Sequence, residues 1–263
     1  MRQALGYHSV PMPMDLNADV GEGCDDAALL PYLTSANVAC GLHAGDPAVM
    51  AKTVGLALER GVRVGAHPGY PDRENFGRIR MDLAPEAIEA LVLYQIGALD
   101  AFVRSLGSSL AHVKPHGALY HAAGESREVA EAVVSGVRRA GGELTVVGQA
   151  GSRLLEAAQR AGLPRAREAF ADRRYRPDGR LVSRTEPDAL LTDPDEAARQ
   201  AVSLARGGFV VARGGERIEV EADSICFHGD TPGAPEIARR VRQALEREGI
   251  AVAPLDRGAR AAV

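Results

Sequence analysis

The sequence predicts an α/β protein whose single domain is a parallel barrel of seven strand–helix units. Short apolar runs alternate with longer amphipathic segments, the pattern of parallel strands joined by crossover helices. The chain has 263 residues, 46% of them hydrophobic, and α/β barrels commonly occupy about 250 residues as one domain. Nearly every apolar run ends in a reactive or hydrogen-bonding residue, as expected where a parallel barrel builds its active site.

Seven apolar runs are the expected strands. In order they are Met14–Asp19, Ala36–Gly41, Arg63–His67, Ala111–His116, Leu144–Gln149, Arg167–Asp172 and Ser224–His228. Apolar residues at three- and four-residue spacing predict helices between them, at Pro47–Arg60, Pro85–Leu106, Ser126–Ala140, Gly151–Ala161, Asp195–Arg206 and Pro235–Glu248. We expect residues 14–255 to form the barrel, residues 1–13 an N-terminal extension and residues 256–263 a C-terminal tail.

Two segments interrupt this alternation. One is the Arg- and Asp-rich stretch Arg173–Pro187, and the other is a possible hairpin from Phe209 to Val220 that turns at Gly214 and Gly215. We expect both at the barrel rim. No internal repeat or linker-like change in composition argues for a second domain.

Charge and cysteine content exclude several classes of protein. A formal net charge of −4, with acids and bases mixed along the chain, gives neither the basic face of a nucleic-acid binder nor a polybasic membrane patch. Cys24, Cys40 and Cys226 form no CxxC pair, so neither a disulfide framework nor a thiolate metal site is indicated. With no apolar signal region and no run of roughly 18 apolar residues, we expect a cytoplasmic protein.

The polar residues at the strand ends are the candidate site. They are Asn17 and Asp19, then Asn37, Cys40 and His43, then His67, Lys114, His116, Gln149, Glu168, Asp172, His228 and Asp230. A lone histidine at a strand end is more often a packed core residue than a catalyst, but four from separate runs favour a site. Asp19, Asp46 and Asp230 have a structural alternative, which is to cap the helix that follows.

Lys114 is singled out by composition. Of the 31 basic residues 29 are arginine, and the two lysines are Lys52 and Lys114. An ammonium group can be buried as a point charge where a planar guanidinium does not fit. This favours a functional role for Lys114 over the alternative that a lysine is present at this position by chance.

The motifs present and missing narrow the type of site. Asp19, His43, His67, His116 and His228 offer N and O ligands for a divalent ion, but no diagnostic spacing occurs, so a metal remains open. The sequence has no GxxxxGK[ST] loop, and GEGCDD does not match GxGxxG. Without a GxSxG elbow or a thiol-hydrolase signature, acid–base chemistry by carboxylate, imidazole and lysine is the better hypothesis.

Six strings in one order resemble the LamB/YcsF family: DLNADVGEG, SANVACGLHAGD, GAHPGYPDRENFGR, HVKPHGALY, FADRRYRPDG and CFHGD. The resemblance runs from about Met14 to Val252. It implies a (β/α)7 barrel of the glycoside hydrolase/deacetylase type. It also implies a hydrolase that opens the cyclic amide of 5-oxoproline to L-glutamate, with ATP as co-substrate and two partner subunits, 5-oxoprolinase subunits B and C (PxpB, PxpC).

Motif by motif, the resemblance also implies site residues. The expected catalytic residues are Asp19, Lys114, His116 and His67; the expected substrate-binding residues are Asn17, Glu22, Asn37, His43, Asp72, Asn75, Arg78, Tyr120, Asp172, Arg173, Tyr175, His228 and Asp230. In this scheme Asp19 or a histidine activates water, and Lys114 stabilises an oxyanion. His121 and Arg174 depart from the family pattern, and we expect both on loops.

Two other functions stay open. The related barrel and the supply of Asp and His would suit a metal-dependent deacetylase of N-acetylated sugars, although fold kinship is a weak argument for chemistry. The chain would also serve as a non-catalytic regulatory subunit that binds a small ligand. Such a protein would tolerate replacement of Lys114 and Asp19.

Overall fold

The computed structural model describes residues 13–255, and within this range seven parallel strands close a barrel in the order β1-β2-β3-β4-β5-β6-β9. The strands are β1 (Asp15–Val20), β2 (Ser35–Ala39), β3 (Arg63–His67), β4 (His112–Val113), β5 (Thr145–Gln149), β6 (Arg165–Phe170) and β9 (Ser224–His228). β1 pairs with both β2 and β9, which closes the ring. The predicted parallel barrel is therefore confirmed.

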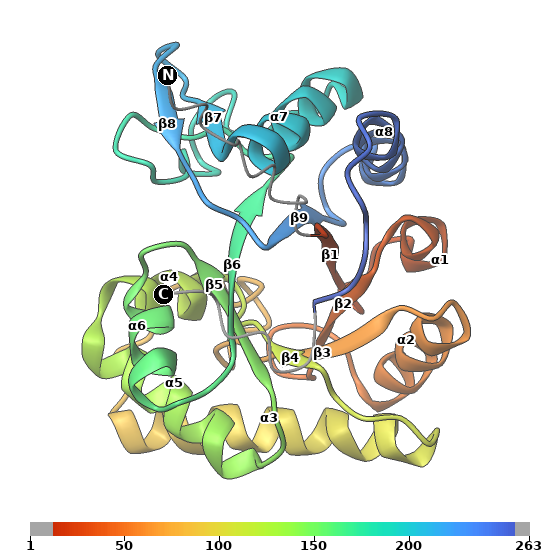
Figure 1. Ribbon diagram of the computed structural model, residues 1–263. Coiled ribbons are helices and arrows are strands. Elements are labelled where there is room, and N and C mark those ends of the chain that lie inside the picture. The colour runs from red at the N-terminus through yellow and green to blue at the C-terminus, as the bar shows by residue number, and fades with distance from the viewer. Residues whose placement is uncertain (1–12, 256–263) are drawn as a thin grey trace, which may run out of the picture.

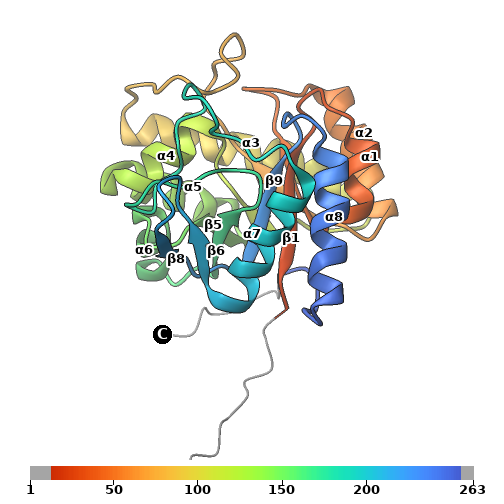
Figure 2. The ribbon, with the colours of Figure 1, turned by 90° about the horizontal axis from the view of Figure 1, so that it is seen from above.

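Helices surround the strands (Figure 1). They are α1 (Asp26–Leu29), the 3₁₀ turn η1 (Leu30–Tyr32), α2 (Pro47–Glu59), α3 (Pro85–Ser105), α4 (Gly117–Glu125), α5 (Arg127–Ala140), α6 (Arg153–Arg160), α7 (Pro194–Gly207) and α8 (Ala234–Arg247). Figure 2 shows β1 and β9 running side by side, with α7 and α8 beside them. None of the helices within residues 13–255 is both long and apolar enough to cross a bilayer.

Strand alternation separates an apolar shell from a polar barrel interior. In β1, Leu16 and Val20 belong to the hydrophobic core shared with the surrounding helices. Asp15 and Asp19 lie on the opposite face of β1 and contact side chains of other strands inside the barrel. Successive strand residues point to opposite faces, so the interior receives the hydrogen-bonding groups while the apolar core forms between strands and helices.

Local structure differs from the sequence expectations at a few positions. His121 lies within α4 and not on a loop; this helix was missed because it begins with Gly117 and contains Gly124, both weak helix formers. Asp46 does cap α2, accepting 2.9 Å from the Val49 amide. Asp19 and Asp230 cap no described helix, since Asp19 pairs within the barrel and Gly233 occupies the N-cap of α8.

The two interrupting segments are both present. β7 (Phe209–Val211) and β8 (Arg217–Glu219) form the predicted antiparallel hairpin. The Arg173–Pro187 stretch is held by isolated bridges from Arg173 to Leu190 and from Tyr175 to Leu181. Arg174 lies on this loop and pairs with Glu196.

The two ends of the described range lie side by side. Met14 bridges to Val252 in a parallel arrangement, and we propose residues 14–255 as the extent of the barrel domain. Apart from Pro13, the predicted extension and the predicted tail lie outside the described residues.

Candidate active site

A buried ion cluster lies at the carboxyl ends of β1, β4 and β6. Lys114 Nζ donates 2.9 Å to Asp19 Oδ1 and 3.0 Å to Cys226 Sγ. The same ammonium lies 2.9 Å from Glu168 Oε1, in an ion pair whose angles fall outside those of a hydrogen bond. Burial disfavours both charges, but the charges of His67 and Lys114 stabilise Asp19, and the charge of Asp19 stabilises Lys114. The pKa of Lys114 is well above its usual value and that of Asp19 well below.

Side chains deeper in the barrel position Asp19. Asn37 Nδ2 donates to Asp19 Oδ1 at 2.9 Å and to Asn17 Oδ1 at 2.7 Å, while its own Oδ1 accepts 2.7 Å from His112 Nε2. Burial lowers the pKa of His112 to about 3, so this ring is neutral. Gly65 makes room for it, because a Cβ there would lie 2.2 Å from the His112 ring.

Sequence reasoning missed His112, although a signal was available. It precedes Lys114 and His116 at two-residue spacing, and such spacing along a strand places side chains on one face. Glu168 was recognised as a strand-end residue but was not among the expected site residues.

His67 and His116 face each other through one nitrogen each. His67 Nδ1 lies 2.7 Å from the Lys114 carbonyl and His116 Nε2 lies 2.8 Å from the Phe76 carbonyl, so both nitrogens carry hydrogen. The remaining nitrogens, His67 Nε2 and His116 Nδ1, are 3.0 Å apart. Two lone pairs at this distance repel, and one proton or one cation between them removes the conflict.

A proton on His67 is consistent with its surroundings. Burial disfavours the charge, but Asp19 Oδ2 lies 3.3 Å from Nε2 and its carboxylate outweighs burial, raising the pKa of His67. Protonated Nε2 would then donate to His116 Nδ1. The pair is therefore a buried proton-sharing unit beside Asp19.

Glu22 and His43 extend the cluster on its outer side. Glu22 Oε1 lies 3.0 Å from His43 Nε2 and 3.2 Å from His116 Nδ1. The interactions with His116, His43 and His67 outweigh burial and lower the pKa of Glu22 to about 2. Burial lowers the pKa of His43 to about 4, so it is a neutral ring.

Donor atoms of Glu22, His43, His67 and His116 lie within 4.8 Å of one another and form a candidate metal site. The rings of His43 and His116 are stacked, with centroids 3.8 Å apart and planes 3° from parallel. Two stacked rings cannot both direct in-plane lone pairs at one ion. Glu22, His67 and His116 are therefore suited to bind one divalent ion together. In this arrangement His43 cannot coordinate the same ion as His116. Asp19, Cys226 and His228 form a second candidate group.

His228 is held by Asp172. Its Nδ1 lies 3.0 Å from Asp172 Oδ1, while Asp172 Oδ2 accepts from the Thr231 hydroxyl at 2.7 Å and from the His228 amide at 2.9 Å. The His228 ring also stacks on Phe170, with centroids 5.4 Å apart. The positive field and hydrogen bonds of His228 outweigh burial and lower the pKa of Asp172 to about 2.

The loop after β3 supplies support from outside the barrel. Asp72 accepts from the Asn75 side chain at 2.8 Å, which shapes a turn leading to Phe76. Phe76 has a φ of +57°, an uncommon value for a non-glycine residue, and it presents the carbonyl that His116 uses. Next to it, a Cβ at Gly77 would come within 2.8 Å of His43. Asp72 and Asn75 are thus loop-forming residues.

A cavity of about 290 Å³ opens above these groups, at the small end of ligand pockets (roughly 300 Å³). Of the expected site residues, Asp19, His67, Arg78, Lys114, His116, Tyr120, Arg173 and His228 line it. The others stand behind or beside the wall. Asn17 and Asn37 lie beneath Asp19, and Tyr175 is buried with its hydroxyl accepting from the Phe170 amide. Arg184, which no sequence argument named, also lines the cavity.

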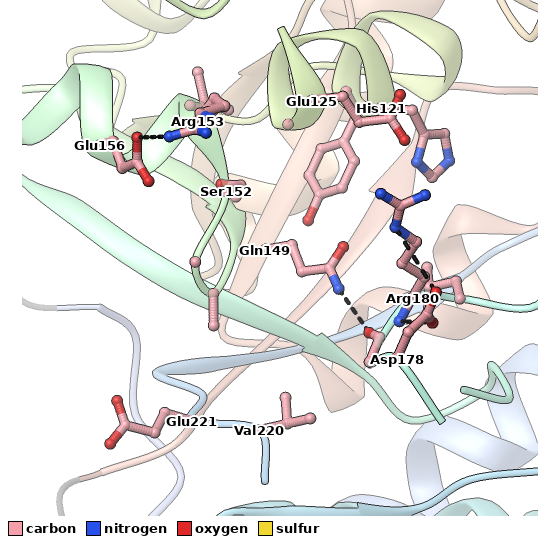
Figure 3. Close-up of a pocket in the computed structure, with 18 of the residues that line it drawn as sticks. His121, Glu125, Gln149, Ser152, Arg153, Glu156, Asp178, Arg180, Val220 and Glu221 are labelled. Carbon is pink, nitrogen blue, oxygen red and sulfur yellow. Dashed lines mark hydrogen bonds and ion pairs between the residues drawn. The ribbon is translucent and has the colours of Figure 1, made fainter. Parts of the chain in front are cut away.

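A larger hollow of about 980 Å³ adjoins this cavity, and Tyr120, His121 and Leu181 border both. Figure 3 shows its walls, where Arg153 pairs with Glu156 and Gln149 donates to the carbonyl of Gly179. Its charged lining is mostly acidic, and neither Asp19 nor Lys114 reaches it. We therefore assign the chemistry to the smaller cavity.

Comparison with known proteins gives a consistent answer. The family model described as LamB/YcsF family matches residues 14–260. The chain belongs to the LamB/YcsF family. It is 54% identical over 91% of its length to a Streptomyces avermitilis protein named as the A subunit of 5-oxoprolinase, of which 98% is covered. A Methylococcus capsulatus protein of the same name is 53% identical over 92% of this chain and 95% of its own.

Solved structures agree with this family. A lactam utilization protein from Thermus thermophilus superposes with a TM-score of 0.88 at 46% identity, covering 93% of this chain and all of that one. A polysaccharide deacetylase from Bacillus cereus matches with a TM-score of 0.53 at 12% identity, covering 94% of each chain. At that identity the deacetylase shares the fold alone.

Within this LamB/YcsF chain, the motif strings meet at one mouth. The DLNADVGEG string provides Asp19 and Glu22, HVKPHGALY provides Lys114 and His116, and CFHGD provides His228, all at carboxyl ends of parallel strands or just beyond them. Their catalytic and substrate-binding roles remain predictions.

Proposed function

We propose that this chain is the A component of a 5-oxoprolinase, a hydrolase that opens the cyclic amide of 5-oxo-L-proline to L-glutamate with consumption of ATP. The observation that carries the proposal is the 54% identity over 91% of the chain to a relative named as the A subunit of that enzyme. The small cavity with its buried ammonium, carboxylate and imidazole groups suits hydrolysis of a compact cyclic amide.

The chemical difficulty is the resonance-stabilised lactam. Transfer of the γ-phosphoryl group from ATP to the amide oxygen would release ADP and leave an electrophilic carbon. Water would add to that carbon, the C–N bond would break to leave an acyl phosphate of glutamate, and a second water would release inorganic phosphate and L-glutamate. Lys114, a buried cation at the cavity, is placed to stabilise the negative charge of the phosphorylated oxygen. Asp19 holds Lys114 and orients His67.

Proton transfer falls to Asp19 and the imidazole pair. We propose that Asp19 accepts the proton that water loses, because His116 Nδ1 accepts the hydrogen bond from His67. Protonated His67 supplies the proton that the ring nitrogen gains as its C–N bond breaks. The side chains behind the wall keep these groups in place. Asn37, which also donates to Asn17, fixes Asp19, and Asp172 fixes His228.

Cofactors and partners follow from the same proposal. ATP is the co-substrate, and subunits B and C complete the enzyme, since the chain has no phosphate-binding loop motif. A divalent ion held by Glu22, His67 and His116 would supply Lewis-acid polarisation of a carbonyl, and it would replace the proton that the two imidazoles otherwise share. Three free cysteines, Cys24, Cys40 and Cys226, support a reducing, cytoplasmic site of action.

One experiment tests the function directly. The chain is mixed with subunits B and C, 5-oxo-L-proline and magnesium ATP, and L-glutamate and ADP are measured. Stoichiometric formation of both is expected. If the three components with ATP produce no glutamate, the proposal fails.

A further inference from the structure

The cavity has a second wall that carries three guanidinium groups. Arg78, Arg173 and Arg184 all line it, and Val182–Thr185 of the loop after β6 form part of the same wall. Two of these arginines share Asp230, which does not itself line the cavity: Arg78 Nη2 lies 2.5 Å and Arg184 Nη1 3.0 Å from its Oδ2. Asp172 is occupied by His228 and Thr231. The wall therefore presents more guanidinium than carboxylate.

Arg173 is a buried cation with an open hydrogen-bond donor. Only 4% of the residue is exposed. Its Nη2 donates 2.6 Å to the Val182 carbonyl, but its Nε is buried with no partner among the described residues. Burial and the nearby charge of Arg184 lower its pKa to about 10. A buried guanidinium with a free N–H beside another cation is stabilised by an added anion.

Arg184 carries the second open donor. Its Nη1 is held by both oxygens of Asp230, at 3.1 and 3.0 Å, which fixes the plane of the guanidinium. Its Nη2 is buried and has no partner in the described part of the chain. Buried N–H groups are rarely left unpaired, and here two of them belong to two arginines that line one cavity.

We propose that Arg173 and Arg184 form a carboxylate-binding subsite, with Asp230 holding Arg184 in position. The ligand class is a small organic carboxylate, whose two oxygens accept the two free donors. This subsite deepens the proposed function and rests on it for one identification: the ligand carboxylate is that of 5-oxoproline. With the carboxylate held on the loop wall, the ring of so small a ligand extends toward the strand-end groups that line the same cavity.

The subsite separates carboxylate recognition from lactam chemistry, so a neutral analogue tests it. Variants Arg184→Gln and Arg184→Lys are compared with wild type using 5-oxo-L-proline and 5-oxo-L-prolinamide, which keeps the ring but lacks the charge. Arg138→Gln, on exposed α5 surface, is the matched control. Melting curves verify folding, and kcat and KM are measured with subunits B and C.

For Arg184→Gln we expect kcat/KM for 5-oxoproline to fall roughly 10- to 100-fold, the effect of losing one charged hydrogen bond. The kcat/KM of Arg184→Gln for 5-oxo-L-prolinamide should stay within about twofold of the wild-type value. Arg184→Lys should recover part of the kcat/KM that Arg184→Gln loses for 5-oxoproline. An equal loss for acid and amide would make Arg184 a structural residue and overturn the subsite. Unchanged kinetics for both ligands would overturn it as well.

Binding to the isolated chain distinguishes failure of the subsite from failure of the function. Calorimetric titration with 5-oxo-L-proline, acetate, inorganic phosphate and ATP uses no catalysis. If Arg184→Gln weakens the binding of a carboxylate, the subsite is supported, even if the three-component mixture makes no glutamate. If the variant weakens only phosphate or ATP binding, the wall recognises the nucleotide, and the carboxylate assignment is wrong.

Discussion

Lys114 Nζ donates a hydrogen bond of 2.9 Å to Asp19 Oδ1, and the two side chains are only 3% and 7% exposed. Lys114 directly follows β4 and Asp19 lies in β1, and these two strands are not neighbours in the barrel. Against the cost of burial, Asp19 is stabilised by His67 and Lys114, and Lys114 chiefly by Asp19. The pair therefore couples opposite sides of the barrel mouth, and removing either member takes one of its main partners from a buried charge.

The first prediction concerns this pair. Lys114→Ala and Asp19→Ala should each abolish most turnover of the three-component enzyme, by about 10²–10³-fold for loss of a charge stabiliser and roughly 10²–10⁴-fold for loss of acid–base help. Kinetics and melting curves on the same samples separate this from a packing role. A packing residue would lower the melting temperature and leave activity per folded molecule near normal.

If either variant keeps near wild-type turnover in an intact assembly, that residue is not catalytic. Retention by both would favour the hypothesis of a non-catalytic regulatory protein. The Lys52→Ala variant, on α2 away from the cavity lining, is the control that loses the other lysine.

The second prediction concerns the chain alone. We expect little or no ATPase or 5-oxoprolinase activity from it, because its sequence has no phosphate-binding loop motif. ADP and glutamate are measured with each component omitted in turn. ATP-dependent glutamate release by this chain without partners would contradict the prediction.

The third prediction concerns acid stability. Burial, the largest cause for each, lowers the pKa of His43 to about 4 and that of His112 to about 3 from 6.5. The unfolded chain therefore binds more protons than the folded chain between pH 6.5 and about 4, and the free energy of unfolding falls as pH falls through that window. Two protons correspond to a slope of about 2.7 kcal/mol per pH unit.

Urea unfolding at several pH values measures this slope. His112→Gln removes one titrating ring, so its slope should be about half that of wild type, while Arg138→Gln should match wild type. His67 acts in the opposite sense, because its raised pKa adds stability that is present below pH 6.5 and is lost as pH rises through its folded value. A stability that does not change from pH 6.5 to 4 would show that these rings are not buried in neutral form.

The fourth prediction separates this chain from the deacetylases that share its fold. We expect no release of acetate from N-acetylated sugar oligomers, with or without added Zn²⁺, Mn²⁺ or Co²⁺. The cavity measures about 290 Å³ and carries Arg78, Arg173 and Arg184 in its lining, which suits a small anion better than a neutral oligosaccharide. Metal-dependent acetate release that disappears in His67→Gln would favour the deacetylase function.

The sequence by itself determined the barrel and showed that the candidate site residues lie at the carboxyl ends of its strands. Apolar runs of five or six residues alternating with amphipathic helices have few architectures available, and parallel strands place their carboxyl ends at one mouth. Hence Asp19, His67, Lys114, His116 and His228 were predicted to converge, and the structure brings them to one cavity. His112 was also within reach of sequence reasoning, through its two-residue spacing from Lys114.

Only the tertiary structure decided which groups touch. Asp19 and Lys114 are 95 positions apart, and no local pattern encodes their pairing across the ring. The tautomers of His67 and His116 depend on backbone carbonyls supplied by Lys114 and by Phe76, the latter held at a positive φ by its loop. Arg184 lies in an irregular segment without periodicity, so its place at the cavity follows from how that segment folds over the barrel. Contacts between distant segments depend on packing geometry, which residue type and spacing do not specify.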